Sequence, residues 1–146
     1  MKELFDVHCH MVPGVDDGAA DLEESLEMLK MQHEDGVRKI IITPHYRRRM
    51  FETPAKKVHE QFLKLQEAAK KEYPDMSLYL GCELHSNMDL QDILEKRKYV
   101  TMAGSSYVLL EFSEGDSAQH IRERVYNVLS CGYEPIIAHV ERYQAT

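Results

Sequence analysis

The stretch LFDVHCH, residues 4–10, places two histidines at the end of a short apolar run, and this arrangement recurs along the chain. Short apolar runs separated by helix-length segments are typical of buried parallel strands. Residues just past the carboxyl ends of such strands converge on one face, so imidazoles and carboxylates there predict a metallohydrolase site. Four further runs end this way: residues 40–42 towards His45, 78–80 towards Glu83, 108–110 into Glu111, and 136–138 into His139.

The apolar pattern predicts five strands with helices between them. Alternation of strand and helix predicts an α/β fold with a parallel sheet, either an open doubly wound layer or a (β/α) barrel. We expect the strands at residues 4–7, 37–43, 78–82, 107–110 and 135–138. We expect the helices from an N-cap at Asp21 to Gly36, from an N-cap at Thr53 to before Pro74, and at residues 87–95 and 118–130.

Composition limits the class of protein. A chain of 146 residues can bury a full core, and we expect a single domain over residues 1–146. The chain has 18 Lys and Arg against 25 Asp and Glu, a net charge of −7, which disfavours a nucleic-acid partner because phosphate backbones bind basic surfaces. Three cysteines without paired spacing favour a reducing compartment. With neither a signal peptide nor a long apolar span visible, we expect a cytoplasmic protein without membrane insertion.

His8 and His10 form the strongest local motif, and Asp16-Asp17-Gly18 follows them. Residues two apart on a strand point the same way, so both imidazoles can reach one ion while Cys9 faces the opposite side. Taken alone, the pair has another explanation, in which one histidine is hydrogen-bonded in the core and the other is solvated. The candidate ligands at the other strand ends favour the metal site.

The remaining candidate ligands follow the later strands. Pro44 imposes an extended turn that aims His45 out of the strand end. Glu83 and Glu111 close apolar runs, where a buried carboxylate needs a compensating charge. A metal supplies that charge. The alternatives are a salt bridge to Arg or Lys or, for Glu83, a carboxylate at a helix start.

Basic residues lie near two of these ligands. Arg142 is about one turn beyond His139, and its planar guanidinium suits phosphate oxygens. An ion pair with a neighbouring acid is the alternative. Arg47 and Arg48 follow His45 on the same predicted face, where they either form a solvated basic loop or attract an anionic substrate.

The sequence lacks the motifs of two enzyme classes that use a covalent intermediate. No cysteine is followed six residues later by arginine, so the cysteine-dependent phosphatase loop is missing, and no Gly-x-Ser-x-Gly nucleophile motif is present. The favoured nucleophile is therefore a metal-bound hydroxide acting on a phosphorus or carbonyl centre. His85, close to Glu83, is a candidate for supporting the site.

These motifs together resemble the manganese-dependent protein-tyrosine phosphatases of the polymerase and histidinol phosphatase superfamily, in the branch associated with capsular and exopolysaccharide synthesis. The likeness runs from residue 4 to the end of the chain. The Pro-Gly-Val-Asp-Asp-Gly spacing is specific to that branch and disfavours a histidinol-phosphate phosphatase, the nearest alternative. The likeness rests on residues 8–18, 43–45, 81–83, 110–111 and 138–143.

The resemblance implies a distorted seven-stranded barrel, of which about five strands are present. It implies two or three divalent ions, typically Mn²⁺, with Fe and Zn as alternatives. The implied catalytic residues are Arg142 and Asp17, the implied substrate-binding residues are Arg142, Arg47 and Arg48, and the implied substrate is phosphotyrosine on a bacterial tyrosine kinase. The implied metal ligands are His8, His10, Asp17, His45, Glu83, Glu111 and His139.

Members of that family usually continue well past this length, with further strands and an Asp-x-His that supplies the last ligands. We therefore expect either an incomplete domain or one that completes itself in a homo-oligomer. Without those ligands, His8 and His10 lack an Asp partner, while the Glu111 and His139 side still holds metal weakly. A catalytically inactive metal-binding fragment is thus the alternative to an active enzyme.

Overall fold

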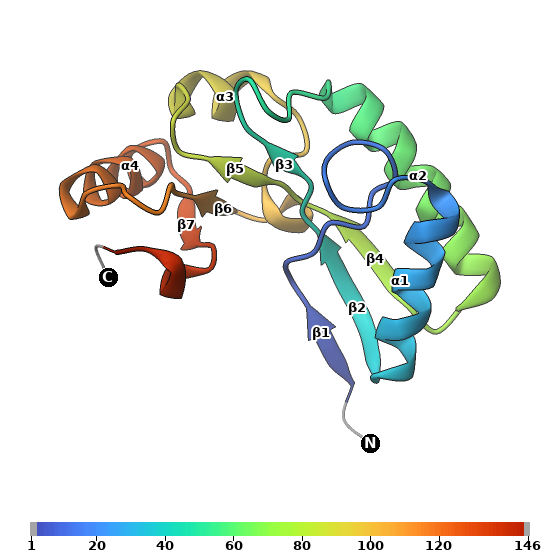
Figure 1. Ribbon diagram of the computed structural model, residues 1–146. Coiled ribbons are helices and arrows are strands. Elements are labelled where there is room, and N and C mark those ends of the chain that lie inside the picture. The colour runs from blue at the N-terminus through green and yellow to red at the C-terminus, as the bar shows by residue number, and fades with distance from the viewer. Residues whose placement is uncertain (1–2, 145–146) are drawn as a thin grey trace.

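The computed structural model describes residues 3–144, in which parallel strands form two short sheets arranged along an arc (Figure 1). Every strand pair described is parallel, which confirms the α/β class. The first sheet has the order β1 (Leu4–Asp6), β2 (Val37–Ile42), β4 (Ser77–Leu80). The second sheet has the order β3 (His45–Tyr46), β5 (Glu83–His85), β6 (Tyr107–Glu111), β7 (Glu134–Ile137).

The two sheets are joined by chain segments that pass from one to the other. β2 leads into β3 through Thr43 and Pro44, and β4 leads into β5 through Gly81 and Cys82. Hydrogen bonds continue across this step, from the Gly81 N–H to the Ile42 carbonyl at 2.8 Å and from the Glu83 N–H to the Pro44 carbonyl at 3.0 Å. If β2 and β3 are counted as one bent strand, and β4 and β5 as another, the strands lie side by side in the order in which they occur in the sequence. Within the described residues, β1 is an edge strand of the first sheet and β7 is an edge strand of the second, and they do not pair with each other. Closure of a barrel therefore stays a prediction.

The strand boundaries differ from the predicted ones where these bends occur. Predicted residues 37–43 and 78–82 end as strands at Ile42 and Leu80. The short strands β3 and β5 were not predicted. Their residues are the polar candidates of the site rather than an apolar run, so the apolar pattern could not show them.

α1 and α3 each begin directly after an aspartate whose side chain accepts a hydrogen bond from a backbone N–H in the first turn of the helix. α1 (Leu22–Glu34) begins after Asp21, whose Oδ1 accepts from the Glu24 N–H at 2.8 Å, as predicted. α3 (Leu90–Lys96) begins later than predicted because Asp89 caps it, accepting from the Asp92 N–H at 3.1 Å. α4 (Ala118–Ser130) has its predicted bounds.

The predicted N-cap of the second helix is wrong. α2 (Ala55–Glu72) has Pro54 at its N-cap position, without a side-chain cap. The Thr53 hydroxyl instead donates to the Val15 carbonyl at 2.9 Å, so it is not available to the helix. This bond ties the start of α2 to the loop that follows β1.

A hydrophobic core lies between the first sheet and helices α1 and α2, which cover one side of it (Figure 1). Val58, Phe62, Leu65 and Ala69 form the apolar side of α2 and are buried there. A second core lies under α3 and α4. On α4, Val128 is buried in this core, whereas the neighbouring Leu129 is 51% exposed. Within residues 3–144, no helix has both the length and the apolar character needed to cross a membrane.

Candidate metal centre

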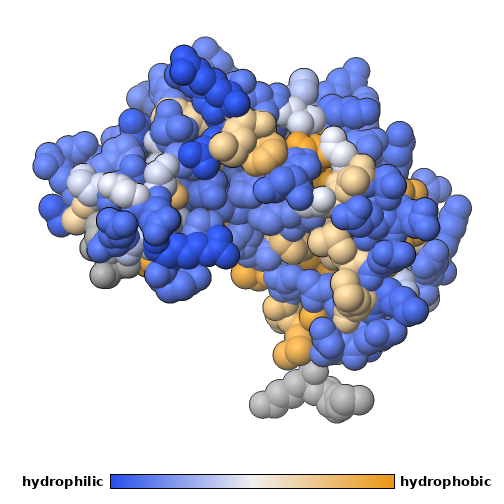
Figure 2. Space-filling model, in the orientation of Figure 1, coloured by the Kyte–Doolittle hydropathy of each residue, from blue (hydrophilic) through white to orange (hydrophobic). Residues whose placement is uncertain are grey.

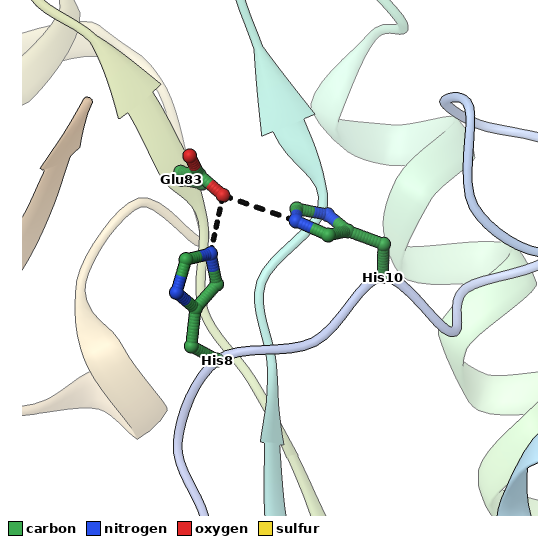
Figure 3. A group of neighbouring side chains, drawn as sticks. All are labelled: His8, His10 and Glu83. Carbon is green, nitrogen blue, oxygen red and sulfur yellow. Dashed lines mark hydrogen bonds and ion pairs between the residues drawn. The ribbon is translucent and has the colours of Figure 1, made fainter. Parts of the chain in front are cut away.

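The Glu83 carboxylate, at the start of β5, is the centre of a histidine cluster. Its side chain is only 1% exposed. Oε1 lies 2.5 Å from His8 Nε2 and 3.0 Å from His10 Nε2. Figure 3 shows both histidine rings directed at this carboxylate. Oε2 lies 3.1 Å from His139 Nε2. The structure therefore brings three predicted ligands from distant parts of the chain onto one buried carboxylate.

The segment after β1 aims both of its histidines at this cluster. Cys9, between them, packs against the first core, as the alternation along an extended chain requires. His10 is held from behind by Asp16, whose Oδ2 lies 3.2 Å from Nδ1. Such a partner fixes the orientation of a ligating imidazole.

Asp16 is a site residue that the sequence analysis did not assign. Its carboxylate accepts from the backbone N–H groups of His45 and Gly18, both at 2.9 Å, in addition to its contact with His10. The signal that could have found it is Gly18, where a Cβ would lie 2.1 Å from the His10 carbonyl oxygen. Only glycine lets the loop fold back this closely, and the fold-back buries Asp16 rather than Asp17.

A second group of ligand-type atoms adjoins the first and shares Glu83 with it. Glu111, at the end of β6, has Oε1 3.5 Å from His45 Nδ1 and Oε2 3.5 Å from His139 Nε2. His45 Nδ1 also lies 3.9 Å from Glu83 Oε1. The ring of His45 stacks on that of His10 with centroids 4.1 Å apart. The two groups thus form one continuous cluster.

Two atoms of the second group are buried without a hydrogen-bond partner, His45 Nδ1 and Glu111 Oε1. Buried polar atoms are normally paired, because desolvation without a partner costs about 1 to 3 kcal/mol. Two ligand atoms that each lie about 2.1 Å from one tetrahedral or octahedral ion are about 3.0 to 3.4 Å apart. The 3.5 Å separation of these two atoms is close to that spacing. The residues present therefore fit a divalent cation.

His139 is held in an unusual backbone conformation. Its φ of 36° and ψ of 53° lie in the left-handed region, which costs a non-glycine residue free energy and is found most often at functional sites. The Tyr143 hydroxyl donates to the Ala138 carbonyl at 2.7 Å, so at 3.2 Å it accepts from His139 Nδ1–H. Nε2 of His139 then faces two carboxylates, and this arrangement needs a proton or a cation between them.

The electrostatics of the cluster favour positive charge next to ionised carboxylates. Burial alone lowers the pKa of His10, but hydrogen bonds to Asp16 and Glu83 reverse this and raise it to about 9. Burial alone raises the pKa of Glu83, but hydrogen bonds to His10 and His8 outweigh it and hold the pKa well below its usual range. A metal ion that binds here must displace the proton from a histidine nitrogen, so metal and protons compete for the same imidazoles.

A cleft of about 570 Å³ opens over the cluster. Of the predicted basic residues, Arg47 and Arg142 line it, whereas Arg48 is exposed at the turn beside it. Asp17 also lines the cleft, with Oδ1 3.7 Å from His45 Nε2 and a side chain that is 66% exposed. The volume lies within the range of small-molecule sites.

Within residues 3–144, the hydrogen bonds of His85 go to partners other than Glu83. This histidine is buried, its Nδ1 accepts from the Asn87 N–H at 3.1 Å, and its Nε2 lies 3.2 Å from Ser113 Oγ. Burial lowers the pKa of His85, with the positive charge of Arg47 acting in the same direction. With Nδ1 as an acceptor, Nε2 carries the hydrogen, so His85 cannot take a proton from Ser113.

The cysteines do not offer a nucleophile at this site. Cys82 is buried, and burial raises the pKa of its thiol to about 12. Burial likewise raises the pKa of Cys9, helped by the negative charge of Asp6. Since the thiolate is the reactive form, both thiols are inert at neutral pH. All three cysteines are free, as expected for a chain without a disulfide framework.

The fold and the cluster together define an α/β protein with a candidate metal site of histidines and carboxylates at the carboxyl ends of parallel strands. Residues 4–146 match the family described as "Capsular polysaccharide synthesis, CpsB/CapC". The chain belongs to this family, which confirms the resemblance seen in the sequence.

Individual relatives have names that agree with this assignment. The chain is 41% identical over 142 residues to the "Tyrosine-protein phosphatase CpsB" of Streptococcus pneumoniae, and 31% identical over 139 residues to the "Tyrosine-protein phosphatase YwqE" of Bacillus subtilis. These matches cover 97% and 95% of this chain but 58% and 55% of the relatives. The chain thus spans little more than half the length of the curated relatives it matches.

A solved structure has the same fold over the shared part. It comes from work on B. subtilis YwqE and S. pneumoniae CpsB, described there as "unique metal-dependent tyrosine phosphatases". Its TM-score to this chain is 0.86 at 30% identity, and the match covers 97% of this chain and 57% of that one. This likeness confirms the predicted fold class.

Proposed function

We propose that this chain carries the metal-binding part of a protein-tyrosine phosphatase that hydrolyses phosphotyrosine on proteins in capsular or exopolysaccharide synthesis. The observation that supports this most is the buried Glu83 carboxylate, which two groups of candidate ligands share. Names of relatives that include "tyrosine-protein phosphatase" support the reaction and the substrate class.

The proposed metal ligands are the seven residues of the sequence prediction: His8, His10, Asp17, His45, Glu83, Glu111 and His139. We propose manganese, in two or three positions, as the metal. Divalent cations at these positions supply Lewis acidity for a phosphoryl oxygen and lower the pKa of water. Asp16 and Tyr143 orient His10 and His139 towards the carboxylates.

The side chains on the cleft wall then handle the substrate. The Arg142 guanidinium lies one turn beyond His139 and is proposed to bind the phosphate and stabilise the charge of the transferring group. Arg47 offers a second cation on the wall, and Arg48, exposed beside it, attracts the anionic phosphoprotein from solution. Asp17 is assigned with Arg142 to the catalytic group, because it reaches the same cleft.

The proposed partner is a bacterial tyrosine kinase of polysaccharide export, met in the cytoplasm. The family description, which names capsular polysaccharide synthesis, supports this choice of partner. A single domain over residues 1–146, or a homo-oligomer of it, would carry the cluster. Activity of this chain by itself is the part of the proposal that needs a direct test.

The test uses a phosphotyrosine peptide and the purified chain, with added manganese and with chelator. The informative variant is His139→Asn, because asparagine tolerates the left-handed backbone at this position while the imidazole is lost. The matched control is His33→Asn, on α1, where the histidine pairs with Asp75 outside the cluster. Manganese affinity is measured for each protein by calorimetry.

Manganese-dependent turnover that His139→Asn abolishes and His33→Asn retains supports the proposal. Manganese binding without turnover supports the alternative, a metal-binding chain that is inactive by itself. If the chain shows no manganese binding and no turnover, this result contradicts the proposed metal site.

A further inference from the structure

The connection from β3 to α2 forms part of the cleft wall and has a defined structure. The Arg47 N–H donates to the Phe51 carbonyl at 2.8 Å, and the Phe51 N–H donates to the Arg47 carbonyl at 2.9 Å. These two bonds close a tight turn in which Arg49 adopts a φ of 66°. The turn presents Arg47, Met50 and Phe51 to the cleft.

Arg97, just past the end of α3, holds this turn from both sides. Its guanidinium lies 3.6 Å from the centre of the Tyr46 ring, which precedes the turn. Its Nη2 donates to the Thr53 carbonyl, which follows the turn, at 2.9 Å. Because the Thr53 hydroxyl also donates to the Val15 carbonyl, both ends of the turn are anchored. Anchoring of this kind lowers the ordering cost of binding.

The wall that the turn builds combines a cation with apolar surface. Phe51 lies over His45 with ring centroids 5.2 Å apart and planes at 21°. Met50 is 58% exposed. Figure 2 shows apolar side chains over the connection between β3 and α2, with hydrophilic side chains around them. The aromatic ring of Phe51 and the polarisable thioether of Met50 are groups that make favourable contacts with another aromatic ring.

We propose that Phe51 and Met50 bind the aryl group of the substrate, so that the cleft selects aryl over alkyl phosphomonoesters, with Arg97 as the positioning residue of this wall. The inference rests on the proposed function, since it assumes that the phosphate lies against the cluster and the cleft arginines. A substrate whose phosphate sits there places its ester group within the same cleft, where Met50 and Phe51 form the apolar lining. Arg47, at the base of the turn, lies in the cleft lining with both the candidate ligands and the apolar side chains of Met50 and Phe51.

The test measures binding rather than turnover. Affinities for phenylphosphonate, methylphosphonate and inorganic phosphate are determined by calorimetry with manganese present. We expect the parent chain to bind phenylphosphonate at least about tenfold more tightly than methylphosphonate, which corresponds to about 1.4 kcal/mol. Phe51→Ala and Met50→Ala are each expected to reduce this preference several-fold, while their affinity for inorganic phosphate stays within about twofold of the parent's.

Controls separate recognition from damage to the site. Manganese affinity is measured for every variant, because Phe51 stacks on a candidate ligand, and Met50→Ala repeats the test at a side chain that has no ring to stack. Met31→Ala is the matched control, since Met31 is 59% exposed on α1 and does not line the cleft. Arg97→Ala is expected to lower the aryl preference without lowering phosphate affinity, an outcome that loss of stability alone would not produce.

The outcomes distinguish the two proposals. If the parent chain binds phosphate with manganese but shows no aryl preference, or if Phe51→Ala and Met50→Ala both keep the full preference, this inference is overturned and the proposed function stands. If the parent chain binds neither phosphate nor phosphonates with manganese present, the proposed function fails and this inference fails with it.

Discussion

The first sheet is covered by α1 and α2, whereas the second sheet is covered by α3 and α4, which bury fewer side chains. α1 buries two side chains and α2 buries four, whereas α3 buries Leu90 and Leu94 and α4 buries only Val128. The ligand-type residues are distributed in the opposite way, since His45, Glu83, Glu111 and His139 belong to strands of the second sheet or follow them directly. The comparison suggests that packing stabilises the first sheet, and that charge compensation within the cluster stabilises the second.

The largest expected effect is on the first core. Leu65→Ala removes a fully buried side chain of α2 and is expected to lower the free energy of unfolding by about 2 to 5 kcal/mol. Leu129→Ala, at a residue of α4 that is 51% exposed, is the matched control and is expected to cost less than about 1 kcal/mol. Urea denaturation measures both. Equal costs would contradict the difference in packing between the two regions.

Metal removal is expected to act mainly on the second sheet. Manganese at about 100 times its dissociation constant should stabilise the folded chain by about 2.7 kcal/mol, and chelator should abolish this gain. Hydrogen exchange followed by mass spectrometry measures where the gain lies, and we expect greater added protection in β5, β6 and β7 than in β2 and β4. A uniform change over both sheets would show that the cluster does not stabilise the second sheet in particular.

A smaller effect is expected at the residue that orients His139. Tyr143→Phe removes the hydroxyl that contacts Nδ1 and should weaken manganese binding by about tenfold, because partners behind a ligating histidine typically contribute this much. Calorimetry measures it. The control is Tyr73→Phe, a tyrosine at the first core. Unchanged affinity in Tyr143→Phe would mean that the backbone alone positions the imidazole.

The smallest effects compare the two helix starts. Asp21 caps α1 by accepting from the Glu24 N–H at 2.8 Å, and Ser117 caps α4 by accepting from the His120 N–H at 3.1 Å. Asp21→Ala should lower the free energy of unfolding by about 1 kcal/mol. Ser117→Ala should cost less, because the less well packed α4 contributes less to the cooperative unit. Denaturation midpoints measure both, and a larger cost for Ser117→Ala would reverse the comparison.

Much of the fold was predictable because the apolar runs and caps are local features. Asp21, Gly36 and the alternating runs determine α1 and the strands near the first core without information from distant residues. The packing of α4 was less predictable, because Val128 or Leu129 could face the core with a small rotation of the helix. Thr53 was misassigned because its partner, the Val15 carbonyl, is far away in sequence.

Six of the seven candidate ligands were predictable because they follow apolar runs, whereas Asp17 was proposed only from the family resemblance. The structure brings His8, His10, Glu83 and His139 together as the strand pattern predicted. Asp16 was missed because its role depends on a loop that folds back at Gly18, and sequence spacing does not show which of two adjacent carboxylates turns inward. The turn with Met50 and Phe51 was not predictable as part of the cleft wall, because Arg97, which holds it, is separated from it by α2, β4, β5 and α3.

Glu83 belongs to both groups of candidate ligands, and this has a consequence for how metal would occupy the site. A single carboxylate that serves two positions makes them thermodynamically coupled, so a cation at one position changes the affinity at the other. By reciprocity, the second cation changes the affinity for the first by the same factor. A titration of this chain should therefore follow a cooperative isotherm rather than the sum of independent sites, and substitution of Glu83 should remove the coupling together with the binding.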